Sequence, residues 1–459
     1  MLTVDTGQAA RKLTPVTSAR LPAAAGGARA AAAVAAAGFT GKTGEVVVVP
    51  GDVPGDWSVL VGVDDGPLGM WALAAAAEKL PAGAYRLAGD AGAALPGWLL
   101  AQHRFESYFT ERAPVKNAKL LLVADAAAIA PAASLAEATA LVRDLVDTPA
   151  GDMTPAALAD AIVAQGERFG ADVAVIAGDA LAHGFPAIHA VGRAATAGPR
   201  LIDLTWGDPA HPKVTLVGKG VTFDSGGLNI KPASGMRLMK KDMGGAAVAL
   251  GVARLVMGTN LPVRLRLIVP AAENAIAGNA FHPGDVLRTR AGITVEIGNT
   301  DAEGRLLLAD ALTYAQEGRP NEGAPELLLD FATLTGAARV ALGPDLPALY
   351  SHDDGLAADL LAAGTAAGDP LWRMPLWRPY AEMIKSSIAD IDNSGEGGFA
   401  GSITAALFLD RFVRPVQAWA HLDLFAWNPT ARPGRPKGGA ATGLGAAFAL
   451  LGRRYGGDR

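Results

Sequence analysis

Residues 214–256 read VTLVGKGVTFDSGGLNIKPASGMRLMKKDMGGAAVALGVARLV, and this stretch changes from strand to helix around a glycine-rich loop. The apolar run at residues 214–217 predicts a buried strand, and the run at 246–256 predicts a helix. The same pattern recurs along most of the chain, because apolar runs of strand length alternate with helix candidates. Further strands are predicted at residues 173–176, 201–206, 263–269, 293–297, 327–331 and 418–425. This alternation favours an α/β fold whose central sheet is mostly parallel and is covered by helices on both faces.

The chain is predicted to contain two domains and a connecting helix. Its 459 residues allow one to three domains. Residues 1–130 alternate between strand and helix patterns but carry no chemical motif, so they predict a smaller N-terminal α/β domain. A connecting helix is predicted at residues 131–150. The larger domain is predicted at residues 151–459, with Thr154 as the N-cap of its first helix and Pro155 at the first helical position.

Composition and charge exclude several classes of protein. Half of the residues are hydrophobic and 19% are charged, which is typical of a chain that buries large cores. The net charge of −5 lacks the basic excess that most nucleic-acid-binding proteins have. The sequence contains no cysteine, which excludes disulfides, cysteine-based zinc sites, iron–sulfur clusters and cysteine nucleophiles. The sequence shows neither a secretory signal nor a membrane-length apolar run, so we expect a cytoplasmic protein without a membrane partner.

Charged residues gather in two glycine-rich loops that follow predicted strands. In sheets of this kind, ligands bind at the carboxyl ends of the strands. We expect the acidic groups of the loops at residues 218–245 and 298–312 to converge, and close together they would raise one another's pKa values. A pair of divalent cations would remove this repulsion, because such ions suit oxygen ligands. The charged residues of the two loops include Lys219, Asp224, Lys231, Lys240, Lys241, Asp242, Asp301, Glu303 and Arg305.

Together these residues favour hydrolysis of a carbonyl bond. Two cations about 3.5–4 Å apart can share a water and lower its pKa. Lysines of the same loop can stabilise the negative charge on the attacked oxygen, and Arg305 can hold a carboxylate or bicarbonate. Each motif alone has a simpler interpretation. Asp301 and Glu303 also suit the first turn of a helix, and Lys240 and Lys241 also suit a solvated surface. The occurrence of both loops in one chain favours the metal site.

The same stretches resemble the leucyl aminopeptidase family, the cytosolic two-metal exopeptidases. The segment NTDAEGRL at residues 299–306 is the signature of that family, and VGKGVTFDSGGLNIKP at 217–232 and KDMGGAA at 241–247 are also similar to it. The resemblance covers roughly residues 140–450. It implies a small N-terminal α/β domain joined by a helix to a larger, doubly wound catalytic domain. It also implies a homohexamer of paired trimers.

The resemblance further implies cofactors and a role for each matching residue. Each subunit would bind two divalent metal ions, with zinc or manganese favoured, and bicarbonate is a possible base. Lys231 would bind the oxygen that becomes negative in the transition state, and Arg305 would anchor the bicarbonate. Lys219 would be a neutral metal ligand, so its pKa should be strongly depressed. The implied metal ligands are Lys219, Asp224, Asp242, Asp301 and Glu303, and the implied substrate contacts are Met239, Thr333, Leu334 and Gly336.

By this resemblance, the chain is a leucyl aminopeptidase-type metalloexopeptidase that releases leucine or a similar residue from the N-terminus of short peptides. Two other functions stay open. A two-metal phosphoesterase would use the same kind of carboxylate-bridged cations. An additional DNA-binding role is found in some bacterial members of the family, although the acidic charge balance makes nucleic acid an unfavoured partner here.

Overall fold

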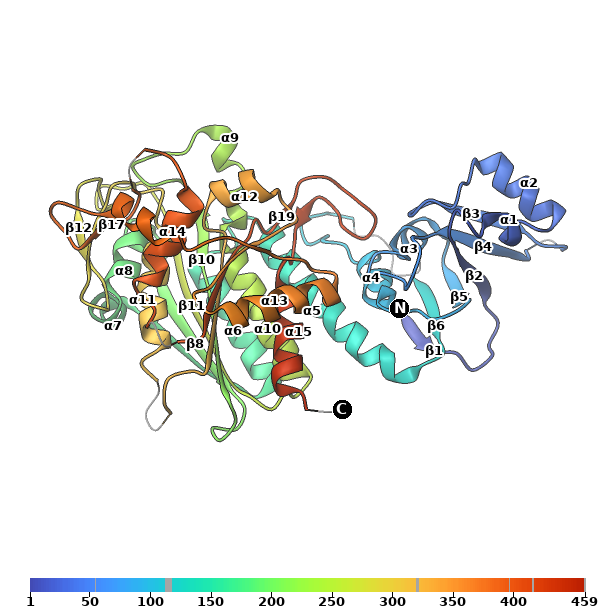
Figure 1. The fold of residues 1–459 in the computed structure, drawn as a ribbon, viewed down its shortest axis with the longest axis horizontal. Coiled ribbons are helices and arrows are strands. Elements are labelled where there is room, and N and C mark those ends of the chain that lie inside the picture. The colour runs from blue at the N-terminus through green and yellow to red at the C-terminus, as the bar shows by residue number, and fades with distance from the viewer. Residues whose placement is uncertain (54, 112–117, 319–321, 396, 415–416, 458–459) are drawn as a thin grey trace. The chain divides into compact units, whose positions relative to one another are not determined.

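The computed structural model describes residues 1–53, 55–111, 118–318, 322–395, 397–414 and 417–457. The chain separates into two compact units (Figure 1). Unit 1 contains residues 1–140 and 430–437, and unit 2 contains residues 141–429 and 438–459. The division after residue 140 falls within helix α5 (Ile129–Asp147). In the described part of the chain, no helix combines the length and the apolar character needed to cross a membrane.

Unit 1 is built on a mostly parallel sheet with the strand order β1-β6-β5-β2-β4-β3. The neighbours β3 and β4 pair antiparallel, and the other neighbours pair parallel. Buried aromatic residues fill its core, where the rings of Tyr85 and Trp98 lie 5.9 Å apart between centroids. The strands are β1 (Leu2–Val4), β2 (Arg11–Val16), β3 (Val46–Pro50), β4 (Trp57–Gly62), β5 (Gly83–Leu87) and β6 (Lys119–Val123). The helices are α1 (Leu21–Ala24), α2 (Ala28–Ala37), α3 (Ala74–Lys79), α4 (Ala94–Leu100) and the 3₁₀ helix η2 (Ala126–Ala128).

Unit 2 is built on a larger sheet whose centre is parallel. Within the described residues, nine strands form this sheet in the order β16-β15-β18-β14-β9-β11-β8-β7, with β10 paired to β11 outside this path. The neighbours from β18 to β11 pair parallel. By contrast, β8 pairs antiparallel with both β11 and β7, and β15 pairs antiparallel with β18. The strands are β7 (Asp172–Ala177), β8 (Arg200–Trp206), β9 (Lys213–Gly218), β10 (Gly220–Asp224), β11 (Arg264–Asn274), β14 (Leu327–Ala332), β15 (Ala348–Tyr350), β16 (Trp372–Arg373) and β18 (Trp419–Asp423). A short pair, β19 (Trp427–Asn428) and β20 (Gly438–Gly439), lies apart from it.

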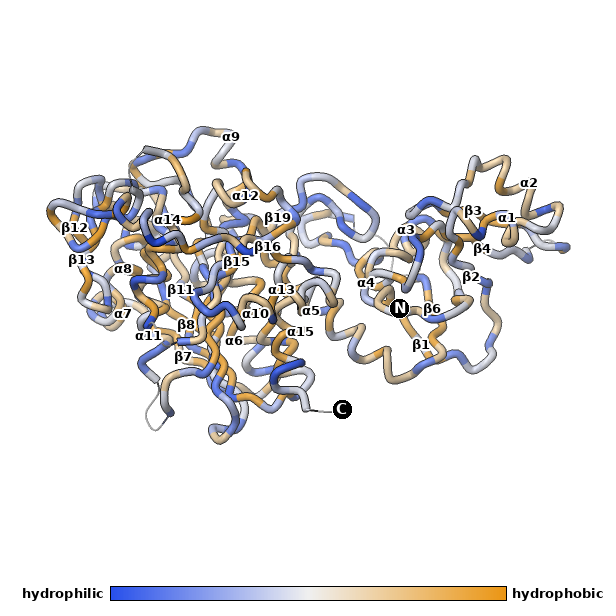
Figure 2. The backbone as a smooth tube through the Cα atoms, viewed as in Figure 1, coloured by the Kyte–Doolittle hydropathy of each residue, from blue (hydrophilic) through white to orange (hydrophobic). Residues whose placement is uncertain are grey.

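Helices cover both faces of this sheet. Figure 1 shows α6, α10, α13 and α15 on one side of the strands and α7, α8 and α11 on the other. Apolar residues are concentrated along the central strands, as the hydropathy colouring of Figure 2 shows. The helices are α6 (Pro155–Phe169), α7 (Gly178–Gly184), α8 (Pro186–Gly192), α9 (Ala233–Met236), η3 (Met239–Met243), α10 (Gly244–Gly258), α11 (Gly304–Ala315), α12 (Gly336–Leu342), α13 (Asp354–Ala367), η4 (Arg378–Ile384), α14 (Gly401–Asp410) and α15 (Leu444–Tyr455). The predicted fold class is therefore confirmed.

One predicted strand lies outside the main sheet. The sequence predicts residues 293–297 as a strand beside the others, but β13 (Thr294–Glu296) pairs with β12 (Val286–Arg288) and β17 (Ile391–Asp392) in a separate sheet. The residues of this stretch alternate between apolar and polar, and Val295 and Ile297 are buried. Such alternation is typical of a strand with one buried face, not of a central parallel strand. The loop at residues 298–312 therefore does not follow a neighbouring strand of the same sheet.

Glycines allow α10 to lie very close to two central strands. A Cβ atom on Gly218 would stand 2.6 Å from the Cα of Ala246, and one on Gly245 would stand 2.2 Å from the carbonyl oxygen of Phe331. These spacings are too short for any side chain, so the backbones of β9, β14 and α10 approach one another directly. The beginning of α10, and η3 before it, are thereby held against the ends of β9 and β14.

Gly245→Ala is expected to destabilise unit 2, because the new methyl group would overlap the backbone of β14. Overpacking of this kind costs about 1–3 kcal/mol, so the urea midpoint should fall. Gly258→Ala is the matched control at the other end of α10, where a new Cβ would stand 3.6 Å from its nearest neighbour. Urea unfolding followed by circular dichroism measures both variants. Equal midpoints for the two would contradict the close approach of α10 and β14.

Candidate metal centre

Three carboxylates from three separate elements meet in the interior of unit 2. Asp224 ends β10, which extends the sheet into a stretch that the sequence analysis assigned to a loop. Asp242 lies in η3, just before α10. Glu303 occupies the N-cap position of α11, and its carboxylate joins this cluster instead of capping the helix. One carboxylate oxygen from each residue lies within 4.8 Å of those of the other two, and all three side chains are buried.

Two lysines lie among the carboxylates. The Nζ of Lys219 is 2.7 Å from Oδ2 of Asp242 and 3.2 Å from Oε1 of Glu303, and only 2% of its side chain is exposed. The Nζ of Lys231 is 2.7 Å from Oδ2 of Asp224 and also contacts Oδ1 of Asp301. The structure therefore brings together all five predicted metal ligands and the predicted catalytic lysine. We call Lys219, Asp224, Lys231, Asp242, Asp301 and Glu303 the central cluster.

Burial and mutual repulsion shift the pKa values of this cluster. Burial, and then the charges of Asp224 and Asp242, raise the pKa of Glu303 to about 8. Burial and the charge of Asp224 raise the pKa of Asp301 to about 6. For Lys219, burial lowers the pKa, but the neighbouring carboxylates outweigh burial and the net shift is upward. The depressed pKa expected for Lys219 assumed cations beside it, whereas carboxylates alone stabilise its ammonium form.

The donor set of the central cluster fits divalent metal ions. Oxygen atoms from several carboxylates suit ions such as manganese, and zinc accepts oxygen and nitrogen ligands. Within the described residues, the buried Oε2 of Glu303 has no hydrogen-bond partner. An unpaired carboxylate oxygen in the interior is unfavourable unless a cation or a donor satisfies it. The unpaired oxygen and the raised acidic pKa values both indicate that a bound cation would stabilise this arrangement.

The buried amide of Asn274 holds the carboxylate of Asp224 in place. The Nδ2 of Asn274 donates to Oδ1 of Asp224 at 2.9 Å and to the carbonyl oxygen of Thr300 at 3.1 Å. Asn274 is fully buried at the end of β11, and it ties the loop before α11 to β10. The role of Asn274 was not predicted from the sequence. The sequence feature that could have indicated this role is a polar residue at the end of the long apolar strand β11.

Asn393 fixes the loop that carries Asp301 and Arg305. Its Oδ1 accepts hydrogen bonds from the backbone N–H groups of Gly298 and Asn299 at 3.0 and 3.1 Å. Its carbonyl oxygen accepts a hydrogen bond from Nη1 of Arg305. Burial lowers the pKa of Arg305 to about 10. No role was predicted for Asn393, because it lies about 90 residues away in the sequence from its hydrogen-bond partners.

One of the four predicted substrate contacts lies in η3, and the other three lie in the segment that leads from the end of β14 into α12. Met239 is half-buried in η3, the 3₁₀ helix that carries Asp242. Thr333 donates from Oγ1 to Oδ1 of Asp242 at 2.8 Å. The N–H of Leu334 donates to Oδ1 of Asp423 at 2.9 Å, and Gly336 is exposed at the start of α12. A substrate pocket lined by these residues stays a prediction.

Asn274→Leu is expected to weaken the binding of Mn²⁺ by about 10–100-fold, because Asp224 would lose a donor that holds it in place. Asn279→Leu is the matched control, since Asn279 is exposed and its Nδ2 donates to the carbonyl oxygen of Arg193. Calorimetric titration of metal-free protein with MnCl₂ gives both affinities. Unchanged affinity in Asn274→Leu would show that Asp224 needs no such support.

Comparisons with known proteins agree with this geometry. The model of the cytosol aminopeptidase family catalytic domain matches residues 140–450, and the M17 aminopeptidase N-terminal domain matches residues 12–123. A probable cytosol aminopeptidase of Roseiflexus castenholzii is 42% identical over 376 residues, which cover 78% of this chain and 75% of the relative. A probable cytosol aminopeptidase of Geotalea uraniireducens is 38% identical over 441 residues, covering 89% and 87% of the two chains.

Solved structures give the same result over nearly the whole chain. The cytosol aminopeptidase of Coxiella burnetii superposes with a TM-score of 0.93 at 46% identity, covering 99% of each chain. The bottromycin maturation enzyme BotP, in complex with Mn, superposes with a TM-score of 0.87 at 36% identity, covering 97% of this chain and 99% of the other. The chain therefore belongs to the cytosol aminopeptidase family, a family of metal-dependent exopeptidases, and the resemblance drawn from its sequence is confirmed.

Proposed function

We propose that this protein is a leucyl aminopeptidase that removes leucine or a similar residue from the N-terminus of short peptides. The proposal rests on three buried carboxylates, those of Asp224, Asp242 and Glu303, which lie close together in the interior. The ammonium groups of Lys219 and Lys231 contact these carboxylates. A cluster of this kind is unfavourable as a purely structural feature, because it concentrates negative charge in the interior. We therefore propose that the cluster serves a reaction that needs bound cations.

We propose that five residues hold two divalent metal ions: Lys219, Asp224, Asp242, Asp301 and Glu303. Such ions, when bound, supply a water of lowered pKa and polarise the carbonyl group of the peptide. Zinc and manganese both suit the donor set, and the manganese complex of the relative BotP supports manganese as one occupant. Lys219 would have to lose its proton to act as a ligand, so a metal ion and a proton would compete for its Nζ, and metal binding would release the proton.

Lys231 is proposed to stabilise the oxygen of the attacked carbonyl. Its ammonium is held by Asp224 and Asp301 and is half-buried, so its direction is fixed before substrate arrives. A preorganised positive charge stabilises the charge that develops in the transition state more than the neutral ground state. The side chain of Arg305, held through Nη1 by Asn393, is proposed to bind bicarbonate, an anion that can accept a proton.

We also propose which residues contact the substrate and how the subunits assemble. Met239, Thr333, Leu334 and Gly336 are proposed to contact the first residue of the peptide. A homohexamer of paired trimers is proposed from the resemblance, and exposed apolar side chains on unit 2, among them Phe399 at 79% exposure, supply surface for subunit contacts. A cytoplasmic location is proposed on the same basis.

Glu303→Ala is expected to lower kcat/KM for a leucyl anilide by at least about 100-fold, because the cluster would lose one of its shared carboxylates. The wild-type protein should lose activity with EDTA and regain it with Mn²⁺. Glu382→Ala is the control, since Glu382 is an exposed residue of η4 that pairs with Lys385. Wild-type turnover in metal-replete Glu303→Ala would refute the assignment. Hydrolysis of a phosphodiester but not of the anilide would point to the phosphoesterase alternative.

Lys231→Met is expected to lower kcat by about 100–1,000-fold while KM changes little, because the lost charge acts in the transition state. Metal content after dialysis, measured by elemental analysis, should stay close to that of the wild type. Lys385→Met removes an exposed lysine as the control. A variant whose kcat is preserved, or one that fails only because it no longer holds metal, would contradict the role given to Lys231.

A further inference from the structure

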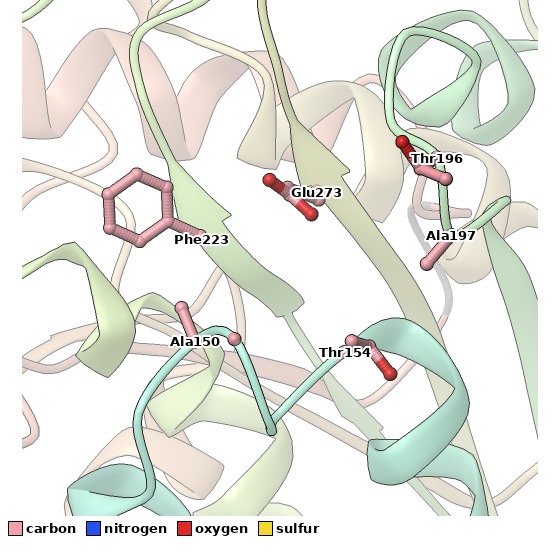
Figure 3. A pocket seen from close by; sticks show the side chains of 7 residues that line it. Ala150, Thr154, Thr196, Ala197, Phe223 and Glu273 are labelled. Atoms are coloured by element: carbon pink, nitrogen blue, oxygen red, sulfur yellow. The ribbon is translucent and has the colours of Figure 1, made fainter.

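An open cavity at the surface of unit 2 is lined by none of the residues of the central cluster. Its volume is about 580 Å³. Figure 3 shows Phe223 on β10 and Glu273 on β11 beside it, with Thr196 and Ala197 on a neighbouring loop and Ala150 on the loop before α6. Apart from Glu273, the lining consists of one aromatic ring, two alanines, two threonines and a glycine. Glu273 is the only ionisable residue among those that line it.

The carboxylate of Glu273 lacks a partner of its own. Among the described residues, no hydrogen bond or ion pair is found for this side chain, although it is half-buried. Burial accordingly raises the pKa of Glu273. The carboxylate still reaches water, but in the described part of the chain no cation beside it offsets its negative charge. A ligand that carries positive charge would satisfy it, whereas an anion would be repelled.

Strand geometry separates this cavity from the central cluster. Phe223 pairs with Glu273 across β10 and β11, and Asp224 pairs with Asn274 one step further along. Successive side chains of a strand point to opposite faces. Asn274 hydrogen-bonds Asp224 on the side of the central cluster, so Phe223 and Glu273 occupy the other face. The cavity is therefore a site of its own, formed by the same two strands.

We propose that this cavity binds a small organic cation with apolar substituents, such as a quaternary ammonium ion. Glu273 supplies the opposite charge, and the half-buried ring of Phe223 offers a negative π face within the same cavity. The small side chains of Ala150 and Ala197 leave space for alkyl groups. The nitrogen of a quaternary ammonium ion has no N–H group and no lone pair, so it cannot bind a metal ion as the free amine of a peptide can.

The test is calorimetric titration of the manganese-loaded protein with choline and with its neutral isostere 3,3-dimethylbutan-1-ol. We expect choline to bind at least about tenfold more tightly than the alcohol, a ratio that corresponds to about 1.4 kcal/mol. Glu273→Gln should remove this preference, and Phe223→Leu should weaken choline binding about threefold or more. Glu167→Gln removes an exposed glutamate of α6 and is the control.

The variants also serve as checks on folding. Glu273→Gln keeps the shape of the side chain, so its thermal midpoint and its hydrolysis of a leucyl anilide should match those of the wild type. If choline and the alcohol bind equally, or if neither binds, the proposal is wrong. It is also wrong if Glu273→Gln, folded and active, keeps the full preference for choline.

Discussion

Four carboxylates and two lysines share one buried space, and their mutual charges constrain the rest of unit 2. Asp242 and Glu303 lie on either side of Lys219, and Asp224 and Asp301 lie on either side of Lys231. This alternation offsets part of the repulsion between the acids, but Glu303 keeps an unpaired oxygen and a raised pKa. The arrangement is held by its surroundings and is completed only by a ligand, which is the physical signature of a functional site.

The fold supplies that support through close backbone packing and buried amides. Gly218 and Gly245 let α10 approach β9 and β14, which places η3 and Asp242 beside Lys219. Asn274 and Asn393 then tie the loop before α11 to β11 and to the segment around β17. These glycines and asparagines thus decide where the charged groups lie. The same β10–β11 pair presents Phe223 and Glu273 to the open cavity.

Much of this could be predicted from the sequence, and the failures have physical causes. The strand at residues 214–217, the helix at 246–256 and the charged residues of both glycine-rich loops follow from local patterns and from the resemblance. The role of Asn274 could not be predicted, because its partner Asp224 is 50 residues away. The stretch 293–297 lies outside the predicted sheet, because its alternating apolar and polar residues bury only one face of the strand. The raised pKa of Lys219 depends on three-dimensional neighbours alone.

The cluster around Asp224, Asp242 and Glu303 is proposed to hold divalent cations. Anomalous diffraction from crystals grown with MnCl₂ and recorded near the manganese absorption edge tests it most directly. We expect two anomalous peaks in each subunit, both in contact with these carboxylates. Anomalous density that is absent from this cluster in a catalytically active crystal, or that lies against other residues, would contradict it.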